Sequence, residues 1–179
     1  MSFMDLKKAA KKYPKENMKG NIECLVEFGE YHCLLAGSDK VAQKVKEKYP
    51  GFPDEYIEWI KLCDGGLLFD TPMLSTCTHD KKLDLDFETY EDYNTPECYQ
   101  DYKLPEGYTI FAVRSDGPVV CFNTKTKDGK VYQWDPETED FTDIWDTFED
   151  WMTEMINISL KLIADGVLEP MAIKEGTDL

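Results

Sequence analysis

The clearest structural signals in the chain lie in the stretch Tyr49-Pro50-Gly51-Phe52-Pro53-Asp54-Glu55-Tyr56-Ile57-Glu58-Trp59-Ile60-Lys61-Leu62-Cys63-Asp64-Gly65-Gly66. Pro53 suits the first position of a helix, where a missing backbone N–H costs nothing. Asp54 and Glu55 then fall in the first turn, where the helix dipole favours negative charge. Apolar side chains follow at helical spacing, and Gly65-Gly66 can adopt the left-handed conformation that closes a helix. The stretch therefore predicts a helix over residues 53–63.

A proline-started helix that carries aromatic residues and ends in Asp64-Gly65-Gly66 resembles the hallmark of the SUKH superfamily, which takes in fungal cell-wall-synthesis regulators and many bacterial immunity proteins. The run from Trp145 to Met152 resembles the start of that family's final helix. The likeness covers roughly residues 38–165 and implies an α+β domain that binds proteins and has no enzymatic activity. Its motif residues are Pro53, Tyr56, Trp59, Asp64, Gly65, Gly66, Phe148 and Trp151.

Two parts of the chain depart from the family pattern. Residues 1–35 match nothing in the family, and the acidic insert over 78–103 is longer than the resemblance leads us to expect. Loose alternation of apolar residues over 22–35, with a turn at Gly29-Glu30, allows a hairpin in the first of these segments.

The remaining signals predict one domain. Ser38 or Asp39 can cap a helix over 39–48, and a second amphipathic helix over 147–165 begins at Thr147. Strands are predicted over 108–113, 119–123 and 131–134. The fold class is α+β: a single domain with a mixed, largely antiparallel sheet of about five to six strands packed with helices. The boundaries are an N-terminal extension over 1–35, a SUKH-like domain over 36–168 and a C-terminal tail over 169–179.

Charge narrows the possible partners. The net charge is −16, but residues 1–50 carry +3 and residues 51–179 carry −19. Between Lys130 and Lys161 there are nine acidic residues and no basic one. Such a field repels nucleic-acid phosphates and attracts basic proteins. The sequence therefore argues against nucleic-acid binding and leaves two interpretations: a solvated acidic surface, or a docking face for a basic protein.

Candidate chemistry is sparse. The six cysteines include no C-x-x-C pair, and neither a secretory signal nor an apolar segment of membrane-spanning length is evident, which predicts a reducing cytoplasm and no membrane partner. Cys77-x-His79-Asp80 is too tightly spaced for a familiar zinc finger. His32-Cys33 would face opposite ways on a strand, so a cysteine–histidine pair is disfavoured. We expect no catalytic residues, no metal and no cofactor.

The sequence thus predicts a non-enzymatic, cytoplasmic protein-binding domain, most concretely an immunity protein that blocks the active surface of a basic bacterial toxin. A regulatory or scaffold module without a toxin partner is the alternative, and a carboxylate-dependent hydrolase is a third class. Tryptophan could serve the interface as an anchor if exposed beside the acidic strip. The predicted partner-binding residues are Glu137, Glu139, Asp140, Asp143, Asp146 and Trp134.

Overall fold

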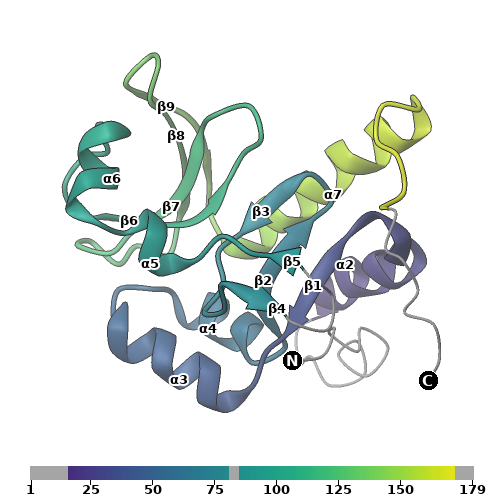
Figure 1. Ribbon diagram of the computed structural model, residues 1–179, viewed down its shortest axis with the longest axis horizontal. Helices are drawn as coiled ribbons and strands as arrows, with labels where there is room; N and C mark the ends of the chain where they lie inside the picture. The colour runs from purple at the N-terminus through teal and green to yellow at the C-terminus, as the bar shows by residue number, and fades with distance from the viewer. Residues whose placement is uncertain (1–15, 81–84, 172–179) are drawn as a thin grey trace.

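The computed structural model describes residues 16–80 and 85–171. Its main feature is a seven-stranded sheet in the order β1-β2-β3-β6-β7-β8-β9, in which every pair of neighbours runs antiparallel (Figure 1). The α+β class is confirmed, and the sheet has more strands than the predicted five to six. The strands are β1 (Cys33–Ala36), β2 (Cys63–Leu68), β3 (Thr71–Met73), β6 (Tyr108–Val113), β7 (Val119–Asn123), β8 (Val131–Asp135) and β9 (Asp140–Trp145), with a separate ribbon of β4 (His79–Asp80) and β5 (Leu85–Asp86).

Helices surround the sheet. Figure 1 shows α2 and α7 close together at the β1 end, α3 and α4 below the sheet, and α6 beside the β8–β9 end. Within the two described ranges, no helix is long and apolar enough to cross a bilayer. The helices are α2 (Glu16–Glu27), the 3-10 turn η1 (Gly29–Tyr31), α3 (Asp39–Lys48), α4 (Asp54–Ile60), α5 (Tyr90–Tyr93), α6 (Pro96–Asp101) and α7 (Phe148–Ala164).

Three predicted helices are confirmed, and their sequence signals explain their limits. The Ser38 hydroxyl caps α3 by accepting the Val41 N–H at 3.2 Å. Thr147 caps α7 in the same way by accepting the Asp150 N–H at 3.1 Å, and Gly166 follows its end with a φ of +68°. Pro53 lies at the N-cap of α4, which ends at Ile60, a shorter helix than predicted.

The predicted hairpin over 22–35 is wrong, because residues 22–27 belong to helix α2. Met18, Ile22 and Leu25 are spaced by four and three residues, and all three are fully buried. Cys24 and Val26, which made the segment look like a strand, are only partly buried. Packing of the helical face thus overrides the weaker alternation. Only residues 33–36 form a strand, and the division of the chain at residue 36 stays a prediction.

The role predicted for Gly65 and Gly66 is also wrong. They do not close a helix but lie inside strand β2, with φ values of +75° and +114°. A Cβ on Gly65 would lie 2.3 Å from the carbonyl oxygen of Leu74, and one on Gly66 would lie 2.3 Å from that of Cys33. Because glycine has no side chain, the backbone of neighbouring segments can approach closely at these two positions, a known reason for glycine within a strand.

The aromatic motif residues form the centre of the core. Tyr56 on α4 contacts Phe148 of α7, with ring centroids 4.9 Å apart. Phe111 of β6 lies against Trp151 at 5.1 Å, and Trp59 is fully buried beside them. The motif helix and the final helix therefore meet over the middle of the sheet, with these side chains inside the core.

Candidate functional site

The five acidic residues that the sequence singles out lie together in the structure. They occupy the β8–β9 turn, strand β9 and the residue that follows, and all are exposed: Glu137, Glu139, Asp140, Asp143 and Asp146. We call residues 131–146 the acidic hairpin. β9 is the last strand of the sheet, so its outer edge pairs with no other strand of the described chain.

Local hydrogen bonds fix the turn of the acidic hairpin. The Asp135 carboxylate accepts the Glu137 N–H at 2.8 Å, as aspartate commonly does in turns. The Asp135 carbonyl accepts the Glu139 N–H at 2.9 Å, and Glu139 adopts a φ of +55°. The turn therefore projects its carboxylates into solvent.

Lysines neutralise only part of this charge. Glu139 forms an ion pair with Lys103, and Asp146 forms one with Lys130 at 2.6 Å. Glu137, Asp140 and Asp143 have no ion pair with any lysine or arginine of the described residues. The hairpin thus keeps a surplus of negative charge at its tip and along its free edge.

Beside these carboxylates lies an aromatic patch that sequence reasoning missed. Tyr108 of β6, Tyr132 of β8 and Phe141 of β9 pack with ring centroids 4.8–5.4 Å apart, and all three are half-buried. Ile144 lies directly across from Tyr132 in the strand pairing and is 55% exposed. We call these four residues the aromatic patch.

The rim of the aromatic patch is acidic as well. The Tyr132 hydroxyl donates to the Asp128 carboxylate at 2.9 Å. Partial burial and this neighbouring carboxylate raise the pKa of Tyr132 to about 12, which keeps the phenol neutral and able to donate. The patch therefore combines apolar rings with hydroxyl groups and surrounding negative charge.

Trp134 does not fit the predicted role of an exposed anchor. Only 6% of the residue is exposed, and its Nε1–H donates to the Tyr102 carbonyl at 2.8 Å. Its ring packs edge-on against Phe141 at 4.9 Å. Trp134 therefore supports the patch from beneath.

The acidic insert supplies a strap, residues 89–104, that holds this end of the sheet. Asn94 donates to the Ile110 carbonyl at 3.0 Å and accepts the Ile110 N–H at 2.8 Å, which ties the strap to β6. Farther along it, Tyr102 and Lys103 make the contacts with the acidic hairpin given above. Residues 85–103 of the insert are therefore mostly structured, whereas 81–84 lie outside the described residues.

Asp64, the acidic member of the motif, is fully buried. Its carboxylate accepts the Thr76 N–H at 3.0 Å and the Thr76 hydroxyl at 2.6 Å. Desolvation raises the pKa of Asp64, while the bonds from Thr76 oppose that shift. The side chain thus fixes the loop that follows β3.

Groups suited to metal or thiol chemistry do not converge. Across residues 16–80 and 85–171, no three or more histidine, cysteine, aspartate or glutamate side chains are grouped so that they could hold a metal ion. Burial raises the pKa values of the Cys63 and Cys121 thiols. None of the six cysteines, all within the described residues, forms a disulfide.

A half-exposed cluster of aromatic residues near polar and charged groups is a composition found at the interfaces of protein-binding domains. Comparison with known families agrees with this class. Residues 50–152 match the family model SUKH_6, described as SMI1-KNR4 cell-wall, and this match spans more than half of the chain. The protein therefore belongs to this family within the SUKH superfamily. No curated protein matches the chain.

The matched segment runs from just before α4 into α7 and contains all the motif residues and all five acidic residues. At the level of the family, the protein is a binding domain of the immunity or regulator type, a group whose members are generally non-catalytic. The long insert falls inside the match, whereas α2 and β1 fall outside it.

Proposed function

We propose that the protein is a cytoplasmic immunity protein that binds a basic toxin domain through the acidic hairpin and the aromatic patch, and so covers the toxin's active surface. The observation that carries the proposal is the half-exposed aromatic patch on the acidic hairpin, in which Glu137, Asp140 and Asp143 have no ion pair with a lysine of the described residues. Family membership supports the general binding role.

The composition of this face supports an interface. Tyrosine is enriched among the residues that dominate binding energy, and such residues lie at the centre of an interface inside a polar rim. Tyr108, Tyr132 and Phe141 would supply this centre, with Ile144 as the most exposed apolar side chain. Phe141 packs against Trp134, which hydrogen-bonds to Tyr102 of the strap, so this ring would lose little side-chain entropy on binding.

The negative charge of the acidic hairpin supports a partner with a basic surface. Glu137, Asp140 and Asp143 would attract a basic surface, such as one that a nuclease toxin uses to hold nucleic acid, and would accelerate association. Because the same carboxylates repel phosphates, the protein would bind the toxin itself and would not bind the toxin's nucleic-acid substrate. Inhibition would then be steric.

A regulatory or scaffold role without a toxin is the second candidate, and the cell-wall description of the matching family favours it. The same face would then bind a basic cellular protein. Gene context separates the two candidates: a large secreted toxin encoded beside this gene supports the first, and its absence supports the second.

Affinity capture from the native lysate tests the binding role. Tagged protein is compared at low and high salt with a triple variant, Glu137→Lys, Asp140→Lys and Asp143→Lys. We expect the unmodified protein to retain one basic partner at low salt and to retain less of it at high salt. In binding kinetics measured with that captured partner, the triple variant should associate at least about tenfold more slowly.

A matched control carries the same charge change elsewhere: Glu23→Lys, Glu27→Lys and Glu30→Lys, three exposed acidic residues of α2 and η1. This control should retain the partner nearly as well as the unmodified protein. Equal losses in both triple variants would show a non-specific charge effect and remove the acidic hairpin from the proposal. Protection of cells from the captured protein, lost in the hairpin variant, would separate immunity from regulation.

A further inference from the structure

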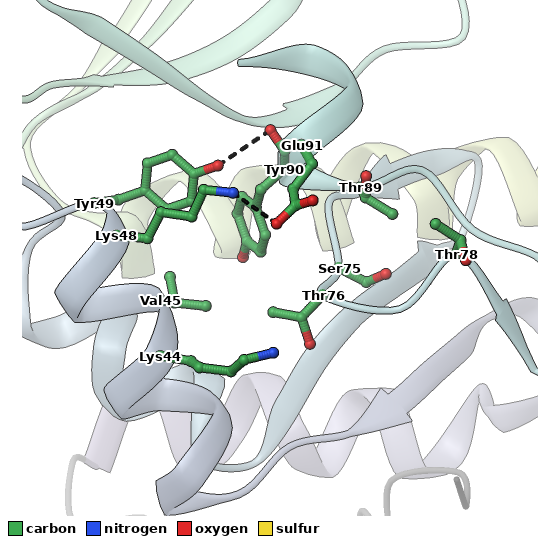
Figure 2. Close-up of a pocket in the computed structure, with 10 residues that line it drawn as sticks. All are labelled: Lys44, Val45, Lys48, Tyr49, Ser75, Thr76, Thr78, Thr89, Tyr90 and Glu91. Atoms are coloured by element: carbon green, nitrogen blue, oxygen red, sulfur yellow. Dashed lines mark hydrogen bonds and ion pairs between the residues drawn. The ribbon is translucent and has the colours of Figure 1, made fainter. Parts of the chain in front are cut away.

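A pocket of about 310 Å³ lies between α3 and the loop and strap that follow β3 (Figure 2). It is formed by elements other than the acidic hairpin, and the proposed partner-binding role does not use it. Its size falls at the small end of the range for ligand sites, roughly 300–1,000 Å³. The lining residues are Lys44, Val45, Lys48, Tyr49, Ser75, Thr76, Thr78, Thr89, Tyr90 and Glu91.

Two ammonium groups reach this pocket from the same face of one helix. Lys44 and Lys48 are four residues apart on α3, so they lie one turn from each other. Lys48 forms an ion pair with Glu91 at 2.6 Å. Lys44 has no ion-pair partner in the described part of the chain, and Figure 2 shows it extending along the pocket toward Thr76. One cation is therefore available, and the other is held by a side chain that can be displaced.

The Glu91 carboxylate indicates what this pair of cations accepts. Its side chain is 77% exposed, and that of Lys48 is 52% exposed, so the ion pair between them is weak and readily exchanged. The hydrogen bond to Lys48 lowers the pKa of Glu91, which keeps the carboxylate charged. A carboxylate of the protein itself thus sits where an external anion could replace it.

The other residues that line the pocket indicate which groups of a ligand could lie beside its anion. Ser75 and Thr76 already donate their hydroxyl hydrogens to the Cys77 carbonyl and to Asp64. Thr78 lines the opposite side of the pocket from Lys48, as Figure 2 shows. Val45 and the ring of Tyr49 form an apolar wall on the α3 side, as Figure 2 shows.

We propose that this pocket binds a small phosphate ester, whose phosphate takes the place of the Glu91 carboxylate between Lys44 and Lys48 and whose organic group rests on Tyr49 and Val45. Two ammonium groups suit a phosphate dianion better than a single carboxylate, because each can donate a charge-assisted hydrogen bond to a different phosphate oxygen. Since Glu91 competes for the same place, it acts as a built-in occupant that an incoming phosphate displaces.

Calorimetric titration of the full chain with phenyl phosphate at low salt tests the site, with phenol and benzoate as probes that lack the phosphate. We expect saturable one-to-one binding of phenyl phosphate that is at least tenfold tighter than that of benzoate, and none of phenol. Lys44→Gln or Lys48→Gln should weaken binding about tenfold or more, because a charge-assisted hydrogen bond is lost. Glu91→Gln should tighten it about two- to fivefold, because only a surface ion pair is removed.

Lys46→Gln is the matched control, since Lys46 lies on the same helix but pairs with Asp54 outside the pocket. It changes the net charge equally and should leave the affinity unchanged. An equal loss in Lys46→Gln, or weaker binding in Glu91→Gln, would overturn the assignment. So would the absence of saturable binding, or a phosphotyrosine peptide that binds far more tightly than phenyl phosphate, which would assign the site to a protein partner.

Discussion

The two ends of the seven-stranded sheet differ in how they meet their surroundings. At one end, β1 carries the buried side chains of Cys33, Leu34 and Leu35, and its neighbour β2 approaches so closely that only glycine fits at position 66. At the other end, β9 exposes three consecutive residues, 142–144, and carries Asp140 and Asp143, which pair with no lysine or arginine within residues 16–80 and 85–171. The side chains at the first end, which we call the closed end, are buried by the rest of the chain, whereas those at the second end are mostly exposed.

This difference separates residues that stabilise the fold from residues that we propose to bind a partner, within one sheet. Burial and close backbone approach at the β1 end leave no room for substitution, so that end contributes to the free energy of folding. The β9 end has side chains whose exposure contributes little to folding and whose chemistry suits a partner. Substitutions at the two ends should therefore have opposite consequences.

The largest effect should come from Gly66→Ala at the closed end. The new Cβ would meet the Cys33 carbonyl oxygen, and the residue would have to keep a φ of +114°. Gly117→Ala is a close control, because Gly117 has a φ of +115° with nothing within 4 Å of an added Cβ. Urea denaturation should show a loss of about 4 kcal/mol or more for Gly66→Ala and about 1–3 kcal/mol for Gly117→Ala. Equal losses in stability would mean that the positive φ alone, and not contact with the Cys33 carbonyl oxygen, requires glycine at position 66.

A pair of truncations compares the two edge strands directly. Leu34→Ala on β1 removes a side chain from a residue that is only 2% exposed and should cost about 2–5 kcal/mol. Ile144→Ala on β9 removes a mostly exposed side chain and should change stability by only about 0.5 kcal/mol. The same denaturation experiment measures both. If Ile144→Ala lowered the free energy of unfolding about as much as Leu34→Ala, the proposed difference in stability between the two ends would be wrong.

The smallest effect should be a pH dependence that originates at the closed end. His32, next to β1, is 6% exposed and donates from Nε2 to the Leu25 carbonyl at 2.7 Å, and burial lowers its pKa in the folded protein. Above about pH 6.5 the ring is neutral in both states, so its full contribution to stability is present. As the pH falls below that value, the unfolded chain binds the proton first, and stability is lost by at most about 1.4 kcal/mol per pH unit.

Denaturation of the unmodified protein and of His32→Gln between pH 7.5 and 5.5 checks this expectation. The variant should lose part of the acid slope, whereas His79→Gln, at the more exposed of the two histidines, should keep it. An unchanged slope in His32→Gln would place the acid sensitivity elsewhere.

Local signals account for what the sequence predicted well. Capping residues and short turns mark α3, α7 and the strands from β6 to β9, because these signals act between residues close in the chain. The acidic residues were also predictable as an exposed group, because charge density is itself a sequence property. Their neutral neighbours were harder to place.

Long-range packing explains what the sequence did not reveal. The conformation of Gly66 depends on Cys33, a residue of another strand, and the burial of Trp134 depends on Tyr102 in the strap. The aromatic patch gathers side chains from β6, β8 and β9, and the pocket gathers three separate segments of the chain. The periodicity of residues within one segment cannot predict contacts between segments that lie far apart in the sequence.

The order of the strands from β6 to β9 follows the order of the chain, and each neighbour is reached through a short connection. Pairing of β1 with β2 instead has to span both α3 and α4, and pairing of β3 with β6 has to span the whole insert. Contacts between residues close in sequence form sooner than distant ones, because less loop-closure entropy is lost. The four-stranded meander is therefore the natural nucleus of folding, and pulse-labelled hydrogen exchange should find residues 108–145 protected before residues 33–36. The surface that we propose to bind a partner would then be the first part of the molecule to fold.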